Sequence, residues 1–91
     1  MIPESIRRYV SRIEEACGEE ADYIVLLKHD LREEAIKKIL TRGVVIRSVS
    51  GVLTYIRYKN KLIGVFSTGK LVMKEIKDKK ELKEILNELL A

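Results

Sequence analysis

Cations and aromatic rings are concentrated in the second half of this 91-residue chain. Residues 35–74 include nine lysines and arginines and no aspartate or glutamate. Basic side chains hold phosphates, and aromatic rings stack on unpaired bases. We therefore predict that single-stranded nucleic acid, DNA in preference to RNA, binds to nine residues: Arg47, Tyr55, Arg57, Tyr58, Lys59, Lys61, Phe66, Lys70 and Lys74.

The same charge pattern has a second explanation. The cations can fold back onto the acidic residues of the flanking segments and balance them within the chain. A surface stabilised in this way intersperses both signs of charge, whereas forty consecutive residues here lack an acid. The pattern favours an anionic partner and leaves intramolecular pairing open.

Catalytic chemistry has few candidates in this sequence. His29 is the single histidine and stands next to Asp30, but no nucleophile lies near it in the sequence. Cys17, the single cysteine, falls on an apolar stripe, where cysteine acts as a small hydrophobic residue. Residues 67–70 end in Gly-Lys like a phosphate loop, yet they open a predicted strand and not a helix. We expect no enzyme activity, cofactor, metal site or small-molecule substrate.

The length of the chain predicts a single domain over residues 1–91. Its first part, residues 1–18, has apolar residues spaced by three and four positions, from Ile6 to Cys17. This spacing predicts an N-terminal amphipathic helix with Pro3 in its first turn.

The rest of the domain, residues 23–91, has the pattern of an α+β fold. The apolar run Tyr23–Leu27 favours a buried strand, and Asp30 and Gly43 are placed to begin and end a helix. The apolar period then falls to two, which predicts an antiparallel meander of four strands over 44–49, 52–58, 62–66 and 70–76. Asp78 can cap a last helix, whose apolar stripe consists of Leu82, Ile85, Leu86, Leu89 and Leu90. We expect an antiparallel sheet of four to five strands in the order strand, helix, four strands, helix.

The predicted strands are apolar on both sides. In residues 52–58, for example, Ile56 and Tyr58 alternate with Leu53 and Tyr55. A sheet with one side in water normally alternates apolar and polar residues, so we expect both sides to be covered. Either the three helices flank both faces, or a partner meets one of them. The alternative function is therefore a protein–protein interaction module: a homodimer, or a subunit of a larger complex, joined through the sheet face or the stripe of the last helix.

A family resemblance supports the same fold. The segment Leu62-Ile63-Gly64-Val65-Phe66-Ser67-Thr68-Gly69-Lys70-Leu71-Val72 resembles a strand-turn-strand segment of the TATA-box-binding protein family. The element order from Tyr23 onward is also similar to one repeat of that family. The resemblance implies that Phe66 corresponds to one of two phenylalanines that wedge into a DNA base step, and that Val72 faces the DNA.

The chain departs from that family in three ways. Val49 stands at the other wedge position, one repeat is present where the family has two, and the predicted N-terminal helix has no counterpart. We therefore do not expect paired wedges to kink duplex DNA. The element order and the basic and aromatic content also resemble small single-stranded-DNA-binding proteins of thermophilic archaea.

Composition bears on location and source. No apolar run reaches the roughly 18 residues that span a bilayer, and the first residues lack the features of a secretory signal. We expect a cytoplasmic protein that does not contact membranes. Gln and Trp are absent while Lys, Glu and Ile are abundant, which is typical of thermophiles. The resemblance to the archaeal single-stranded-DNA-binding proteins implies an archaeal source.

Overall fold

The computed structural model describes residues 3–16 and 23–91. These residues form three helices and six strands, together with one short 3₁₀ turn. In chain order the elements are α1 (Glu4–Tyr9), β1 (Val10–Glu15), β2 (Tyr23–Leu27), η1 (His29–Leu31), α2 (Arg32–Arg42), β3 (Val44–Val49), β4 (Leu53–Tyr58), β5 (Lys61–Phe66), β6 (Lys70–Met73) and α3 (Lys79–Leu90). The α+β class predicted from the sequence is confirmed.

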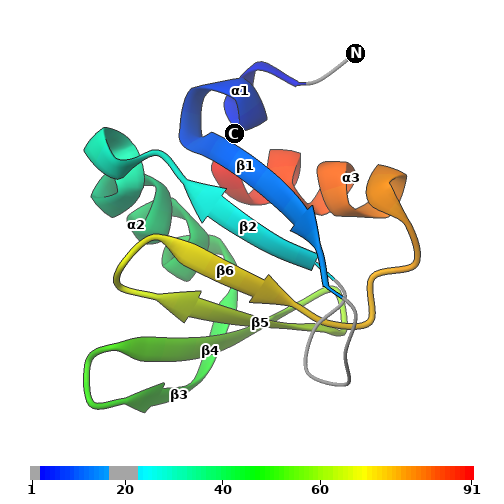
Figure 1. Cartoon of the computed structure of the whole chain (residues 1–91). Helices are drawn as coiled ribbons and strands as arrows, with labels where there is room; N and C mark the ends of the chain where they lie inside the picture. The colour runs from blue at the N-terminus through cyan, green and yellow to red at the C-terminus, as the bar shows by residue number, and fades with distance from the viewer. Residues whose placement is uncertain (1–2, 17–22) are drawn as a thin grey trace.

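The strands form one sheet in the order β1-β2-β6-β5-β4-β3, and every neighbouring pair is antiparallel (Figure 1). The last four strands make the predicted meander. The β4–β5 connection is a two-residue hairpin in which Lys59 and Asn60 both have positive φ. Such a turn matches the twist of the flanking strands and fixes their register. Strand β6 ends at Met73, three residues earlier than predicted.

The predicted N-terminal helix is wrong beyond Tyr9. Residues 10–15 instead form β1, which pairs with β2, so the sheet has six strands where four to five were expected. Without β1, the apolar strand β2 would lie at the sheet edge with unpaired backbone groups. Val10 and Ile13, which are β-branched, suit a strand as well as a helix. Cys17 lies outside the described residues.

Two predicted helix ends are confirmed and one is wrong. Asp78 caps α3, because its Oδ1 accepts a hydrogen bond from the backbone N–H of Glu81 at 2.9 Å. Gly43 ends α2 as expected, and a Cβ there would come within 2.6 Å of Ile56 Cδ1, so a larger residue would require the Ile56 side chain to shift. Asp30 does not cap α2; it lies in η1, and α2 follows Leu31 without a side-chain cap.

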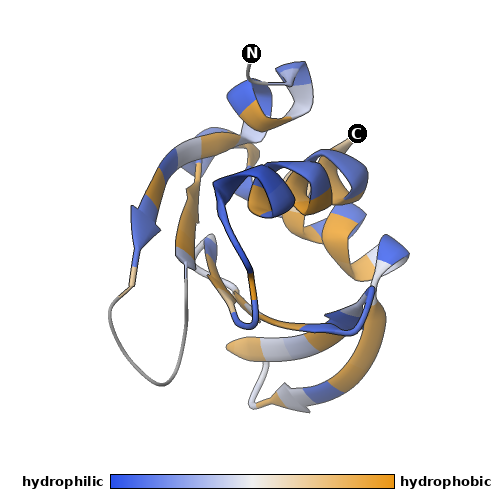
Figure 2. Ribbon diagram, turned by 90° about the vertical axis from the view of Figure 1, so that its right-hand side faces the viewer, coloured by the Kyte–Doolittle hydropathy of each residue, from blue (hydrophilic) through white to orange (hydrophobic). Residues whose placement is uncertain are grey.

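All three helices lie on one face of the sheet, which curves around them (Figures 1 and 2). The core between them includes a row of paired strand residues, Tyr23, Met73, Ile63 and Ile56, each buried. The apolar stripe of α3 faces the same core, and Figure 2 shows its hydrophilic side turned outward. The predictions that helices flank both faces, or that this stripe joins a partner, are therefore wrong for the described residues.

Candidate nucleic-acid interface

One face of the sheet carries no described helix, and its side chains can be assigned from the strand register. Adjacent paired residues lie on the same face, and residues next to one another along a strand lie on opposite faces. Tyr55 is paired with Gly64, Gly64 with Val72, and Val72 with Ile24. Because Ile56, the neighbour of Tyr55, faces the helices, this row lies on the opposite side.

We call this surface the open face. Its residues on the edge strand β3 are Val44, Arg47 and Val49, and those on the other strands are Ile24, Leu26, Leu53, Tyr55, Arg57, Leu62, Gly64, Phe66, Lys70 and Val72. The large apolar side chains on these other strands are half-buried, whereas residues paired on the helix side, such as Ile56, Ile63 and Met73, are buried. The open face is therefore an apolar surface in contact with solvent, which the sequence pattern predicted to be covered.

Tyr55 lies close over Gly64 at the middle of the open face. A Cβ on Gly64 would stand 3.6 Å from Tyr55 Cε1 and 3.4 Å from Leu53 Cδ1. Gly64 is itself buried because these neighbours cover it. The Tyr55 and Leu53 side chains thus cover the glycine in the strand at van der Waals distance.

Phe66 and Lys70 face each other across the β5–β6 turn. The Lys70 Nζ stands 5.6 Å from the centre of the Phe66 ring, within the range of a cation–π interaction. The turn is tied to the sheet, because the Leu27 N–H donates a hydrogen bond to the Gly69 carbonyl at 2.8 Å. Gly69 has a φ of 99°, a conformation that favours glycine. The ring and the cation are thus held at a fixed position at one end of the face.

Four cations of the open face form no ion pair within the described part of the chain. Among the described residues, Arg47, Arg57, Lys70 and Lys74 take no part in any of the ion pairs found. Lys74 follows β6 directly, and its N–H donates to the Leu62 carbonyl at 3.2 Å. No strand from β2 to β6 contains an acidic residue. As far as residues 3–16 and 23–91 show, these four side chains are therefore available to an anion.

The remaining three predicted residues lie on the helix side and contact α3. Lys59 Nζ stands 2.6 Å from Glu88 Oε1, and the Tyr58 hydroxyl donates to the same oxygen at 2.7 Å. Lys61 pairs with Glu81 at 3.5 Å and donates to the Glu75 carbonyl at 2.6 Å. For these residues the intramolecular explanation of the charge pattern holds, and we leave them out of the proposed site.

These contacts shift the titration of the groups involved. Hydrogen bonds from Lys59 and Tyr58 lower the pKa of Glu88. The hydrogen bond to Glu88 raises the pKa of Tyr58 and of Lys59, because each group gives up this contact with the carboxylate when it deprotonates. The Lys77 backbone N–H and the Lys61 ammonium lower the pKa of Glu81. The cations opposite α3 are thus bound to carboxylates that stay ionised.

Sequence reasoning missed the contribution of β1 and β2 to the open face. Ile24 and Leu26 extend the apolar surface, and Arg12 stands opposite Leu26 on β1. Arg12 is exposed, but its Nε lies 3.5 Å from Glu14 Oε1, which is also on this side of β1. The β-branched residues Val10 and Ile13 were the available signal, and the helical spacing outweighed it.

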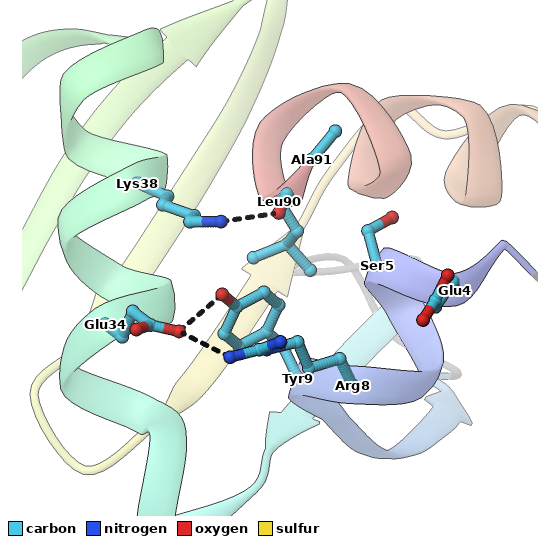
Figure 3. Close-up of a pocket in the computed structure, with 8 residues that line it drawn as sticks. All are labelled: Glu4, Ser5, Arg8, Tyr9, Glu34, Lys38, Leu90 and Ala91. Atoms are coloured by element: carbon cyan, nitrogen blue, oxygen red, sulfur yellow. Dashed lines mark hydrogen bonds and ion pairs between the residues drawn. The ribbon is translucent and has the colours of Figure 1, made fainter.

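A hollow of about 370 Å³ lies on the other side of the molecule, between α1, α2 and the end of α3 (Figure 3). Tyr9 projects into it, donates a hydrogen bond to Glu34, and lies between the cations of Arg8 and Lys38 at 5.5 and 5.0 Å from its ring centre. Arg8 is 3.8 Å from Glu34, and Lys38 donates to the Leu90 carbonyl at 3.4 Å. The Tyr9 hydrogen bond and the two cations lower the pKa of Glu34. These polar groups satisfy one another and join the three helices.

His29 is exposed at the start of η1 and contacts the guanidinium of Arg32.

In the described part of the chain no helix has the length and apolar character needed to cross a membrane. Comparison with protein-family models, curated proteins and solved structures found no match to this chain.

Proposed function

We propose that this protein binds single-stranded nucleic acid on the open face and that it is not an enzyme. One observation carries the proposal: a sheet surface without a covering helix bears aromatic rings and cations that have no acidic partner among the described residues. Arg47, Arg57, Lys70 and Lys74 would hold phosphates, while Tyr55 and Phe66 would stack on bases. Unpaired bases fit this surface better than a duplex, because stacking needs a free base face.

The resemblance to the TATA-box-binding protein family suggests duplex DNA as a competing ligand. Val49, which stands at the position of the second wedge, is paired with Leu53 and so lies on the open face near Phe66. A single large ring and a valine offer less to insert between base pairs than two phenylalanines do. We therefore place single strands first, DNA ahead of RNA, and include the duplex as an arm of the test.

The proposal is tested by titrating the protein into fluorescently labelled oligonucleotides, either single-stranded DNA, matched RNA or the corresponding duplex, over a series of salt concentrations. Four phosphate contacts predict a slope of log K against log salt of about −3 for single strands, since each contact contributes about −0.7. Tighter binding of the duplex than of either single strand would overturn the strand preference. Absence of binding at low salt would overturn the function.

Substitutions separate stacking from phosphate contact. Tyr55→Ala should weaken binding by about 1–3 kcal/mol with little change in salt slope, and Tyr55→Phe should retain binding because the ring remains. Arg57→Ala should weaken binding and reduce the slope by about 0.7. The matched control is Lys37→Ala, which removes an exposed cation from α2 on the other side of the sheet. An equal loss in Lys37→Ala would show that binding is not confined to the open face.

A second candidate function is self-association or docking on a larger complex. The observation that favours it is the apolar edge strand β3, whose residues are all exposed. The two functions are compatible because strand pairing uses the outer backbone edge of β3, whereas nucleic acid would bind the side chains of the open face, with Arg47 of β3 belonging to both regions.

A further inference from the structure

The two edges of the sheet differ in chemistry. The exposed large hydrophobic side chains of the described residues are Val44, Val45, Ile46, Val49 and Val52. Four of them belong to β3, and the fifth follows in the turn to β4. Figure 1 shows this strand at the lower edge of the sheet, and its sequence is apolar except for Arg47 and Ser48. The outer backbone N–H and C=O groups of β3 have no neighbouring strand, which makes this edge a template for pairing.

The opposite edge, β1, has features that protect an edge from such pairing. It carries Arg12, Glu14 and Glu15, and its register shifts near Ser11. Glu15 lies 3.5 Å from Lys79 Nζ, and Arg12 is paired with Glu14. Both edge strands have a register shift, but three of the six β1 residues are charged and only one of the six β3 residues is, and charged side chains on an edge discourage the addition of another strand. The molecule thus has one edge suited to strand addition and one that is not.

We propose that two copies of this chain associate by antiparallel pairing of β3 with β3. Identical antiparallel strands are related by a two-fold axis perpendicular to the sheet, so one strand supplies both halves of the interface. Each copy uses its single apolar edge, and the charged β1 edges remain at the two ends. The assembly therefore closes at a dimer with a continuous sheet of twelve strands.

The sequence of β3 favours one register. The strand has a register shift at Ile46 in its pairing with β4, and Arg47 is its one charged residue. Pairing centred between Ile46 and Arg47 sets Val44 of one copy beside Val49 of the other. It also keeps the two Arg47 side chains from standing directly opposite each other, where like charges destabilise a strand pair.

The interface is small. One strand edge with its exposed side chains buries less than the roughly 800 Å² per partner of a standard stable interface. We therefore expect the dimer to dissociate on dilution rather than to be permanent. In the dimer both open faces lie on the same side of the joined sheet, so the basic surface of each copy continues into the other.

The experiment is sedimentation velocity on the full chain under reducing conditions, from about 1 µM to about 1 mM, a range that spans weak to moderate dissociation constants. The wild type should pass from monomer to dimer. Ile46→Lys should stay monomeric, while the matched control Val52→Lys should still dimerise. Positions 46 and 52 are 50% and 52% exposed, so the two substitutions add the same charge at similar exposure, one on the edge strand and one beyond it.

Amide hydrogen exchange provides a second measurement, which distinguishes dimer formation at β3 from a general change in folding. The amides of residues 44–49 should gain protection as the wild-type concentration rises, and those of 10–15 on β1 should not. A melting temperature of Ile46→Lys close to that of the wild type confirms that the variant is folded. A wild type that remains monomeric at the highest concentration, an equal effect of both lysine substitutions, or assemblies larger than a dimer would overturn the proposal.

This inference does not depend on nucleic-acid binding, and the two can fail separately. A wild type that dimerises without binding oligonucleotide refutes the proposed function alone. A monomer that binds oligonucleotide refutes the dimer alone. If both proposals hold, Ile46→Lys should bind single strands with about half the occluded length of the wild-type dimer.

Discussion

Single contacts decide which of the basic residues are available on this protein. Glu88 is the clearest case, because its carboxylate binds both Lys59 and Tyr58 and so withdraws two predicted binding residues from the surface. Arg47, Arg57, Lys70 and Lys74 of the open face form no ion pair with the described residues, whereas Arg12 at its β1 edge pairs with Glu14. A cation that faces α3 is thus paired with a carboxylate of that helix, whereas a cation on the open face stays in solvent.

We expect Glu88→Gln to flatten the pH dependence of stability at both ends. The lowered pKa of Glu88 means that its stabilising contribution is complete above the ordinary value of 4.5 and is lost as the pH falls through the lowered pKa. The raised pKa values of Tyr58 and Lys59 give a contribution that is complete below 10.0 and 10.5 and is lost as the pH rises through the raised values. The glutamine variant should lack both.

Urea unfolding as a function of pH measures this effect. Glu33→Gln is the control, because Glu33 is an exposed carboxylate on α2 that forms none of the ion pairs found among the described residues. In Glu88→Gln, the loss of stability at low pH should be only partly removed, since Glu34 and Glu81 also have lowered pKa values. Identical pH profiles for wild type and Glu88→Gln would show that this contact contributes nothing.

At the scale of elements, the helix ends test how local sequence fixes the fold. Asp78→Ala should lower the free energy of unfolding by about 1 kcal/mol, because the Glu81 N–H loses its acceptor at the start of α3. Asp78→Ser, which restores a side-chain acceptor, should recover most of that loss. Urea unfolding of the three proteins measures the difference. A full loss in Asp78→Ser would indicate that the charge of Asp78, and not the cap, is what stabilises the helix.

The elements that could be predicted are those whose signals are local. The strands from Val44 to Met73 follow from the apolar period and the turn residues, and α3 follows from its cap and stripe. Residues 10–15 could not be predicted, because what makes them a strand is their pairing with the edge of β2 and not the spacing of their own side chains. Asp30 had the right type for a cap, but the 3₁₀ turn places the helix start beyond it.

The candidate site was predictable to the same extent. Tyr55 and Arg57 share one face and Ile56 and Tyr58 the other by simple alternation, so the two groups could be separated from the sequence. Which face the helices cover could not be determined, because both sets of side chains are apolar enough to be buried. That choice decided the assignment of Tyr58, Lys59 and Lys61, and it depends on how α3 packs. The cytoplasmic location and thermophilic source stay predictions.

At the scale of the whole molecule, the N-terminal segment completes both the core and the sheet. Ile6 and Tyr9 are nearly fully buried against the other helices, and β1 covers the edge of β2. The apolar strand β2 would otherwise be a second edge open to pairing. Under the proposed β3 pairing, the segment therefore leaves β3 as the apolar edge at which two copies would join.

Removal of residues 1–16 should destabilise the protein and produce assemblies larger than a dimer. Loss of the buried Ile6 side chain alone costs about 1.5–3 kcal/mol, and the uncovered β2 edge allows growth at both ends of the sheet. Thermal unfolding and light scattering measure the two effects. As a control, Glu15→Ala breaks only the exposed pair with Lys79 and should change stability by less than about 1 kcal/mol. A deletion variant that melts like the full chain without assembling would contradict this role.

The arrangement of every helix behind the sheet has a practical consequence. Lys37 and Glu33 of α2 are exposed on the side away from Tyr55 and Phe66. A tether attached at either residue would fix the protein through its helix side and leave the open face of the sheet directed to the solution in a single orientation. A layer of protein immobilised in this way would present the same sheet face of every molecule to a ligand in solution.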